Sequence, residues 1–336
     1  MQKITNILAI ESSCDETSAA IIQNGKVLSN HIATQHVHER YGGVVPELAS
    51  RAHMQNIIPV VDAAIKDAGI VNEEITALAF TQAPGLIGSL LVGACFAKAF
   101  AQARNLPLIA VHHMQAHVLA HFIDEQPPFP FMCLTVSGGH TQIVLCKDYL
   151  NMEIMGETID DAAGEAFDKV AKMLGLPYPG GPLVDKYAKL GDPLRFKFPL
   201  SEMPEYNFSF SGVKTSILYF LQKERKLDPD FAEKNLNDIC ASAQYTIVKM
   251  LINKLTKAAK AQNIKHVGIA GGVSANSGLR KALLEAGEKN GWKVYIPKFE
   301  YCTDNAAMIG ITGYYKFLKG DFTDLSVSPS ARATWG

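Results

Sequence analysis

The sequence lacks closely spaced cysteines and any apolar run long enough to cross a membrane. Its six cysteines are scattered without a C-x-x-C pair, several of them in apolar runs, which predicts reduced, mostly buried thiols in a cytoplasmic protein. The most apolar stretch, residues 85–97, is too short to span a bilayer, and the apolar start of the chain is too brief for a signal peptide. We therefore expect a soluble protein without a membrane partner.

The sequence also lacks a dominant charge. Its 32 Lys and Arg against 33 Asp and Glu give a net charge of −1 over 336 residues, so any nucleic-acid surface must be a local patch or be shared with a partner. The candidate RNA contacts are diffuse, and for each one alone a solvated helix face is the plainer interpretation. They are Lys189, Arg195, Lys197, Lys214, Lys249, Lys254, Lys257 and Lys260.

Strand and helix patterns follow the same order in both halves, which predicts an α/β protein of two duplicated βββαβαβα lobes around a nucleotide cleft. A chain of this length is expected to form two cores rather than one. We expect a first lobe of residues 1–125 plus 305–336, with the closing helix 305–318 packing back on it. The second lobe, residues 126–304, carries a helical insertion that includes one long helix over residues 228–262, capped by Asp228 and Pro229.

Three loops at strand ends combine glycine, hydroxyl or carboxylate residues: residues 11–17, 137–141 and 271–276. Glycine allows backbone N–H groups to approach a phosphate closely, and a helix N-terminus adds a positive dipole. A tight turn explains each loop taken alone, but three at matching places of a duplicated fold predict a nucleotide site. Walker and Rossmann signatures are absent, which argues against those two nucleotide folds.

His113 and His117 form the sharpest local signal. Spaced i, i+4, their rings share one face of a helix and can bind one metal, although a partly buried pair without metal is the alternative. Asp304, in a loop on the predicted cleft side, supplies a carboxylate ligand. A zincin protease would need a glutamate where Met114 stands, so the sequence argues against a protease.

Several acidic residues surround the helix expected at residues 161–174. Asp160 or Asp161 is expected to cap it, and Asp168 lies two turns beyond Asp161 on the same face, where it can meet a ligand. Asp185 is expected on the exposed first turn of the helix that follows the rigid turn at residues 179–182.

Long motifs in this order resemble the universal tRNA threonylcarbamoyladenosine synthase family. They are ESSCDETS from Glu11, GGVVPELASR from Gly42, APGLIGSLLVG from Ala83, HHMQAH from His112, SGGHTQ from Ser137, DDAAGEAFDKVAKMLGLPYPGGP from Asp160, FSFSGVKT from Phe208, AGGVSAN from Ala270 and CTDNAAMI from Cys302. The SGGHTQ form resembles the bacterial branch. The resemblance covers nearly the whole chain and implies an actin-like/Hsp70-like sugar-kinase fold.

The resemblance also implies a reaction and its site. The family transfers a threonylcarbamoyl group from threonylcarbamoyl-AMP to N6 of the adenosine beside the anticodon, in tRNAs that read codons beginning with A. It implies one divalent metal held by His113, His117 and Asp304, with Fe²⁺ expected and Zn²⁺ as the alternative. The nucleotide part of the substrate is expected at Thr135, Val136, Ser137, Gly138, Gly139, Asp168, Gly181, Asp185 and Asn276.

The same resemblance implies four partners: tRNA, a smaller paralogue that dimerises with the chain, a P-loop ATPase, and an upstream synthase that supplies threonylcarbamoyl-AMP. The attacking amine needs a base, and we assign Asp15 or Glu16 only because they follow the first strand. A phosphotransferase or a silent scaffold remains an alternative on this fold, but neither has an evident use for the histidine pair.

Overall fold

The computed structural model describes residues 4–333, and its internal contacts divide the chain into two units. The first comprises Met1–Pro127, Asp148–Met152 and Pro297–Gly336, and the second comprises Pro128–Lys147 and Glu153–Ile296. Residues 297–304 thus group with the first unit, whereas the sequence predicts them in the second lobe. Two contacts explain the grouping: Lys298 Nζ lies 2.6 Å from Asp124 Oδ1, and Tyr301 packs in an apolar cluster of the first unit.

The first unit is built on a mixed five-stranded sheet in the order β3-β2-β1-β4-β5. Its strands are β1 (Asn6–Glu11), β2 (Glu16–Gln23), β3 (Lys26–Thr34), β4 (Ala77–Ala83) and β5 (Leu108–His112). β1 runs antiparallel to β2 and parallel to β4, which runs parallel to β5. Every residue of β1 is buried, as expected for a central strand covered on both faces.

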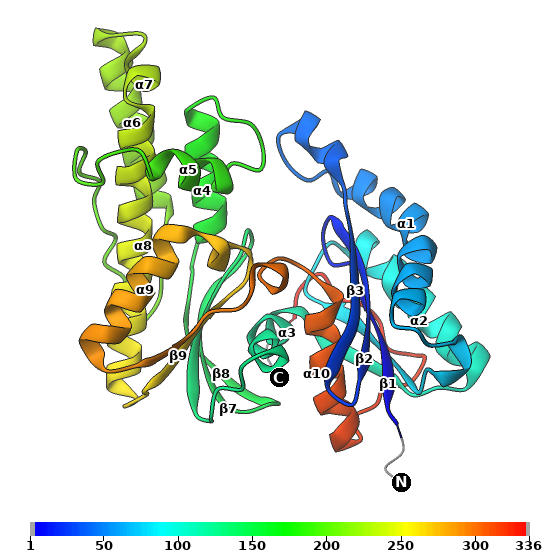
Figure 1. The fold of residues 1–336 in the computed structure, drawn as a ribbon. Coiled ribbons are helices and arrows are strands. Elements are labelled where there is room, and N and C mark those ends of the chain that lie inside the picture. The colour runs from blue at the N-terminus through cyan, green and yellow to red at the C-terminus, as the bar shows by residue number, and fades with distance from the viewer. Residues whose placement is uncertain (1–3, 334–336) are drawn as a thin grey trace. The chain divides into compact units, whose positions relative to one another are not determined.

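Helices cover both faces of this sheet (Figure 1). They are α1 (Pro46–Asp67), α2 (Ile87–Arg104), α3 (His113–Leu119) and α10 (Ala306–Lys319). Leu8 and Ile10 of β1 pack in the apolar cluster with α1 and α2, whereas Ile7 and Ala9 pack in the cluster with α3 and α10. α10 thus packs against the sheet of the first unit.

The second unit repeats this arrangement on a five-stranded sheet in the order β10-β9-β6-β7-β8. Its strands are β6 (Phe131–Val136), β7 (Thr141–Asp148), β8 (Asn151–Glu157), β9 (His266–Ala270) and β10 (Lys293–Tyr295). β6 pairs antiparallel with β7 and parallel with β9, as β1 does with β2 and β4. The duplicated element order predicted from the sequence is confirmed.

The helical insertion of the second unit differs from the prediction at one point. Its helices are α4 (Ala163–Met173), α5 (Gly181–Ala188), α6 (Ser211–Leu227), α7 (Phe231–Lys234) and α8 (Leu236–Ala261), and α9 (Ser277–Asn290) follows β9. The prediction of a single helix over residues 228–262 is wrong, because α7 and α8 occupy this range as separate helices. Asp228 ends α6, and its side chain accepts a hydrogen bond from the Asp230 amide at 3.1 Å, which forms a turn before α7 and α8.

The predicted cap of α4 is also wrong. Ala162 occupies the N-cap position, while Asp160 accepts a hydrogen bond from the Phe210 amide at 2.9 Å. Asp161 instead pairs with Lys169 and Lys214, both at 2.9 Å. These contacts connect the start of α4 to α6, so the acidic residues hold two elements together rather than capping one.

The six cysteines are free and four of them are buried, as the sequence predicted. Within residues 4–333, no helix combines the length and the apolar composition that crossing a bilayer requires.

The contact of α10 with the first sheet gives a prediction about stability. A Cβ atom added at Gly313 would lie 2.6 Å from the Ala79 Cβ of β4. Neither the backbone of α10 nor that of β4 can move away without disturbing its own packing. Gly313→Val should therefore lower the free energy of unfolding by about 1–3 kcal/mol, measured by urea denaturation. Leu318→Val places the same residue on the same helix at a position that is 60% exposed and is the matched control. Equal effects of the two variants would contradict close packing at Gly313.

Candidate functional site

Two histidines and one aspartate converge in the first unit. His113 is the first residue of α3, His117 lies one turn later, and Asp304 lies in the loop before α10. Asp304 Oδ1 is 3.1 Å from His117 Nε2 and 3.4 Å from His113 Nε2. One ligand atom from each residue lies within 4.8 Å of the others, a spacing that one metal ion can bridge.

A buried carboxylate that was not predicted from the sequence lies behind His113. Glu11, the last residue of β1, is fully buried, and its Oε2 lies 3.0 Å from His113 Nδ1. Its carboxylate also accepts hydrogen bonds from the Ser13 amide at 2.5 Å and from Thr81 Oγ1 at 2.6 Å. Glu11, Thr81 and His113 come from the carboxyl ends of three adjacent parallel strands, β1, β4 and β5.

The hydrogen bond to Glu11 decides which nitrogen of His113 faces Asp304. A carboxylate can only accept, so His113 Nδ1 carries a proton and Nε2 points to the cluster. This is the arrangement that metal-binding histidines ordinarily have, with a carboxylate behind the ring. His117 differs, because its buried Nδ1 has no hydrogen-bond partner in the described part of the chain.

The three charges hold one another in place. Burial would lower the pKa of His113, but the carboxylates of Asp304 and Glu11 raise it well above its ordinary value. Burial would likewise raise the pKa of Asp304, but His113 and His117 lower it. Protonated His113 therefore sits between two carboxylates, and a divalent cation can take the place of that proton. Two imidazole nitrogens and one carboxylate oxygen suit Fe²⁺ or Zn²⁺, so the residues fit the expected metal.

Asp15 and Glu16 lie where β1 turns into β2, beside this cluster. Burial, followed by the charges of Asp304 and Asp15, raises the pKa of Glu16 to about 10. His53 of α1, also missed from the sequence, holds this turn: its Nε2 donates to the Cys14 carbonyl at 2.9 Å. Thr17 Oγ1 lies 2.8 Å from His53 Nδ1 and donates to it, and burial lowers the pKa of this histidine, which fits the neutral ring.

In the second unit, the ends of β6 and β9 bring two of the predicted loops together. Gly271 has φ +84°, and a Cβ there would lie 2.5 Å from the Val136 carbonyl oxygen. Thr135 and Val136 are fully buried, so within the residues 135–139 only Ser137, Gly138 and Gly139 present accessible groups. The glycine pair is exposed and nothing lies within 4 Å of where its Cβ atoms would be.

The remaining predicted nucleotide residues lie around α5. Asp168 Oδ1 accepts hydrogen bonds from the amides of Gly180 and Gly181, both at 2.9 Å, and burial raises the pKa of Asp168. Asp185 accepts a hydrogen bond from Ser277 Oγ at 2.7 Å. Asn276 caps α9 by accepting from the Leu279 amide at 2.9 Å. Asp185 is only 9% exposed, so its expected place on an exposed turn is wrong.

The Asp185–Ser277 hydrogen bond connects α5 to the start of α9, which buries the aspartate. Asp168 also has a structural role, because its two amide contacts hold the turn before α5. The structure therefore brings His113, His117 and Asp304 together in one unit and the predicted nucleotide residues together in the other.

Comparison with known proteins identifies the family. Residues 26–311 match the family model described as tRNA N6-adenosine threonylcarbamoyltransferase. A protein of that name from Christiangramia forsetii is 64% identical over 98% of this chain and 98% of its own length. Another from Cytophaga hutchinsonii is 59% identical over 98% of this chain and 96% of its own length.

Distant solved structures agree on the actin-like fold alone. HypF from T. kodakarensis superposes with a TM-score of 0.61 at 14% identity, covering 97% of this chain and 50% of that one. Component A of (R)-2-hydroxyglutaryl-CoA dehydratase from Acidaminococcus fermentans gives 0.52 at 15% identity, covering 93% and 98%. The family model and the close relatives go further than the fold, and by them this chain belongs to the tRNA N6-adenosine threonylcarbamoyltransferase family.

Proposed function

We propose that the chain transfers a threonylcarbamoyl group from threonylcarbamoyl-AMP to N6 of the adenosine beside the anticodon, in tRNAs that read codons beginning with A. The observation that carries the proposal is the buried His113, His117 and Asp304 cluster, with Glu11 behind it, in a chain of this family. The reaction takes place in the cytoplasm and depends on a divalent metal, Fe²⁺ or Zn²⁺.

His113, His117 and Asp304 are the ligands of that metal in this proposal, and Glu11 orients the first of them. When bound, the metal would supply a positive charge that binds the threonylcarbamoyl group and polarises its carbonyl. Met114, which is buried beside the ligands, has no proton to exchange and gives no support to a protease.

The second-unit residues bind the AMP portion of the substrate. Gly138 and Gly139 are exposed with nothing near their Cβ positions, which supports phosphate binding at their backbone amides. In this proposal the side chains of Asp168, Asp185 and Asn276 meet the ribose and base. As the reaction proceeds, negative charge develops on the departing phosphate. Fixed amide dipoles stabilise that charge without having to reorganise.

The transfer forms a bond from N6 to the carbamoyl carbon and breaks the bond from that carbon to the phosphate oxygen, so AMP leaves. One proton of the amine must go to a base. Because the pKa of Glu16 is raised to about 10, this residue is protonated at neutral pH, and we assign the base to Asp15. Glu16 remains a hydrogen-bond donor beside it.

Four partners complete the proposal: tRNA, a smaller paralogue that pairs with this chain, a P-loop ATPase, and a synthase that makes threonylcarbamoyl-AMP. Their support is the family to which the chain belongs.

The function is tested by mass spectrometry of tRNA nucleosides from cells depleted of the protein. Threonylcarbamoyladenosine should disappear and return with the wild type but not with His113→Ala, because that variant removes one of three converging ligands. Rescue by Leu318→Val controls for expression. Unchanged modification in depleted cells that carry no second copy of the enzyme would overturn the proposed function.

Glu11→Gln should weaken metal binding about ten- to a hundredfold, measured by competition with a chelator. The amide is isosteric, but its NH₂ group can donate to His113 Nδ1, which moves the ring proton to Nε2 and blocks the ligand position. Loss of thermal stability alone, with unchanged metal affinity, would assign Glu11 a structural role only.

In the wild type, metal binding should strengthen as pH rises. The raised pKa of His113 means that the ring is protonated at neutral pH and must release that proton to bind a metal. Calorimetry in buffers of different ionisation enthalpy should detect one released proton at neutral pH. No proton release at that pH would contradict the charge state assigned to His113.

The rate of single-turnover transfer to a tRNA transcript distinguishes the roles of Asp15 and Glu16, the two acids of the β1–β2 turn. Asp15→Asn should slow transfer about 10²–10⁴-fold, as loss of a general base does. Glu16→Gln, which resembles the protonated acid, should stay within a few-fold of the wild type. Normal transfer by Asp15→Asn would rule out this assignment, and normal transfer by both variants would exclude the turn as the source of the base.

A further inference from the structure

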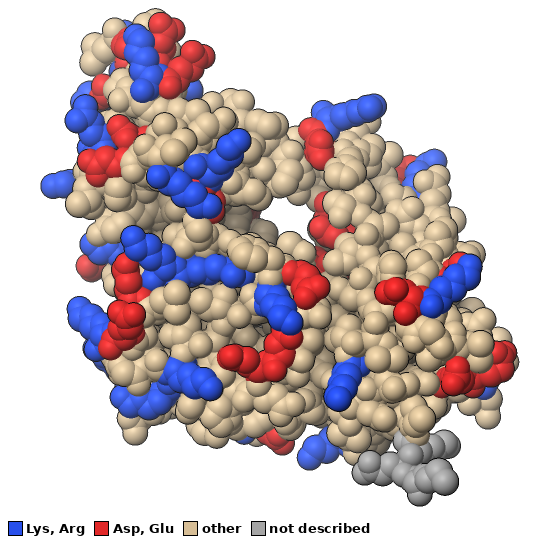
Figure 2. Space-filling model, viewed as in Figure 1, with Lys and Arg blue, Asp and Glu red and all other residues tan. Residues whose placement is uncertain are grey.

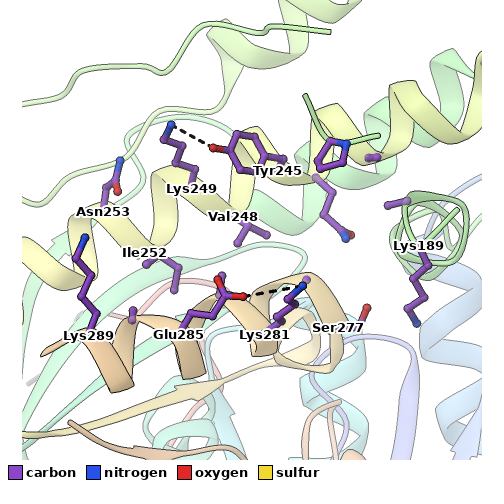
Figure 3. Close-up of a pocket in the computed structure, with 17 residues that line it drawn as sticks. Lys189, Tyr245, Val248, Lys249, Ile252, Asn253, Ser277, Lys281, Glu285 and Lys289 are labelled. Atoms are coloured by element: carbon purple, nitrogen blue, oxygen red, sulfur yellow. Dashed lines mark hydrogen bonds and ion pairs between the residues drawn. The ribbon is translucent and has the colours of Figure 1, made fainter. Parts of the chain in front are cut away.

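A groove on the second unit lies outside the chemistry described above. It is a cavity of about 940 Å³ between α8 and α9, with the C-terminal end of α5 at one end. Figure 3 shows Lys189 and Ser277 near one end and Lys289 and Asn253 near the other, with Val248 and Ile252 between the two helices. The groove thus has a polar rim and an apolar floor.

The lining is basic, in contrast with the chain as a whole. It includes Lys189, Lys249, Lys281 and Lys289, and Glu285 is its one acidic residue in the described chain. Figure 2 shows both signs of charge mixed over the viewed face, and the net charge of the chain is −1. Lys249 and Lys289 form no ion pair within the described residues, so their charges are available to an anionic ligand.

An aromatic ring lies among these lysines. Tyr245 of α8 is 40% exposed, and Lys249 Nζ lies 5.3 Å from its ring centroid and 3.4 Å from its hydroxyl. Exposed aromatic rings beside positive charge are the elements with which proteins bind single-stranded nucleic acid, because bases stack on the ring and phosphates meet the cations.

The groove begins at the predicted nucleotide residues. Gln244 Oε1 accepts a hydrogen bond from Asn276 Nδ2 at 2.7 Å, and Ser277 Oγ donates to Asp185 at 2.7 Å. Both Gln244 and Ser277 line the groove. From Ser277 to Lys289 along α9 the groove extends roughly 18 Å at the rise of an α-helix, which is longer than one mononucleotide. The dimensions fit a polymer that continues away from the nucleotide residues.

We propose that this groove binds single-stranded RNA of the tRNA substrate, with Lys249 and Lys289 at phosphates and Tyr245 under a base. The proposal rests on the proposed function, since it names a surface for the same substrate. Of the RNA contacts predicted from the sequence, the proposal selects Lys249. Lys189 also lines the groove but is paired with Asp185, Lys214 is paired with Asp161, and Lys254 donates to the carbonyl of Glu205.

Binding of a fluorescent, unmodified tRNA transcript to the purified full-length chain tests the groove. The double variant Lys249→Glu/Lys289→Glu should weaken binding at least tenfold and lower the slope of log affinity against log salt by about 2. Lys223→Glu/Lys265→Glu makes the same change of charge at exposed positions of this unit outside the groove and is the control. Thermal unfolding verifies that both variants are folded.

Tyr245 provides a second, charge-independent test. Tyr245→Ala should weaken tRNA binding roughly tenfold, as loss of a stacked base does, while Tyr245→Phe should bind like the wild type. In the transfer assay Tyr245→Ala should raise KM for tRNA and leave kcat at saturating tRNA unchanged.

Three results would overturn the groove as an RNA site. The first is equal tRNA affinity of the groove variant and its control, and the second is a wild-type chain that does not bind tRNA. The third is a groove variant that loses as much affinity for ADP, used as the nucleotide probe, as it loses for tRNA. That result would make the groove part of the nucleotide site. A wild-type chain that binds tRNA through the groove but transfers no threonylcarbamoyl group would refute the proposed function. It would still support the groove as an RNA-binding site.

Discussion

The burial of one carboxylate organises the site of the first unit. A charge in a fully buried position is costly unless hydrogen bonds and an opposite charge compensate it. Glu11 receives that compensation from the Ser13 amide, the Thr81 hydroxyl and the His113 ring, which belong to three parts of the chain. The same contacts that stabilise the carboxylate therefore fix the turn after β1 and the orientation of α3.

The duplicated sheet explains why functional residues gather where they do. In both units parallel strands place their carboxyl ends side by side, and loops that leave these ends converge. The first unit fills this edge with ionisable groups, Glu11, His113 and Asp304, which interact strongly because they are buried. The second fills it with glycine-containing loops and helix starts, which present backbone amides. One architecture thus gives two chemically different surfaces.

The sequence predicts the element order and the converging histidines because both follow from local periodicity and spacing. Three features needed the folded chain. Glu11 ends an apolar run, and a charge there signals a buried partner, but the partner is 102 residues away. Asp185 is buried by Ser277 on α9, a contact that no local pattern encodes. The helix expected at residues 228–262 is interrupted because Asp228 caps a turn as readily as it caps a helix.

The glycines of the nucleotide motifs divide into two kinds, and the division bears on which of them a ligand needs. Gly271 and Gly164 are required by packing, because a Cβ at either would collide with the carbonyl of Val136 or Ser137. Gly138 and Gly139 have no such neighbour, and neither has a φ that only glycine adopts easily. Their side-chain positions are open, so packing within the folded second unit does not account for glycine at either position. A ligand that must approach the backbone amides closely does account for it, and this favours Gly138 and Gly139 as the phosphate-binding part of the site.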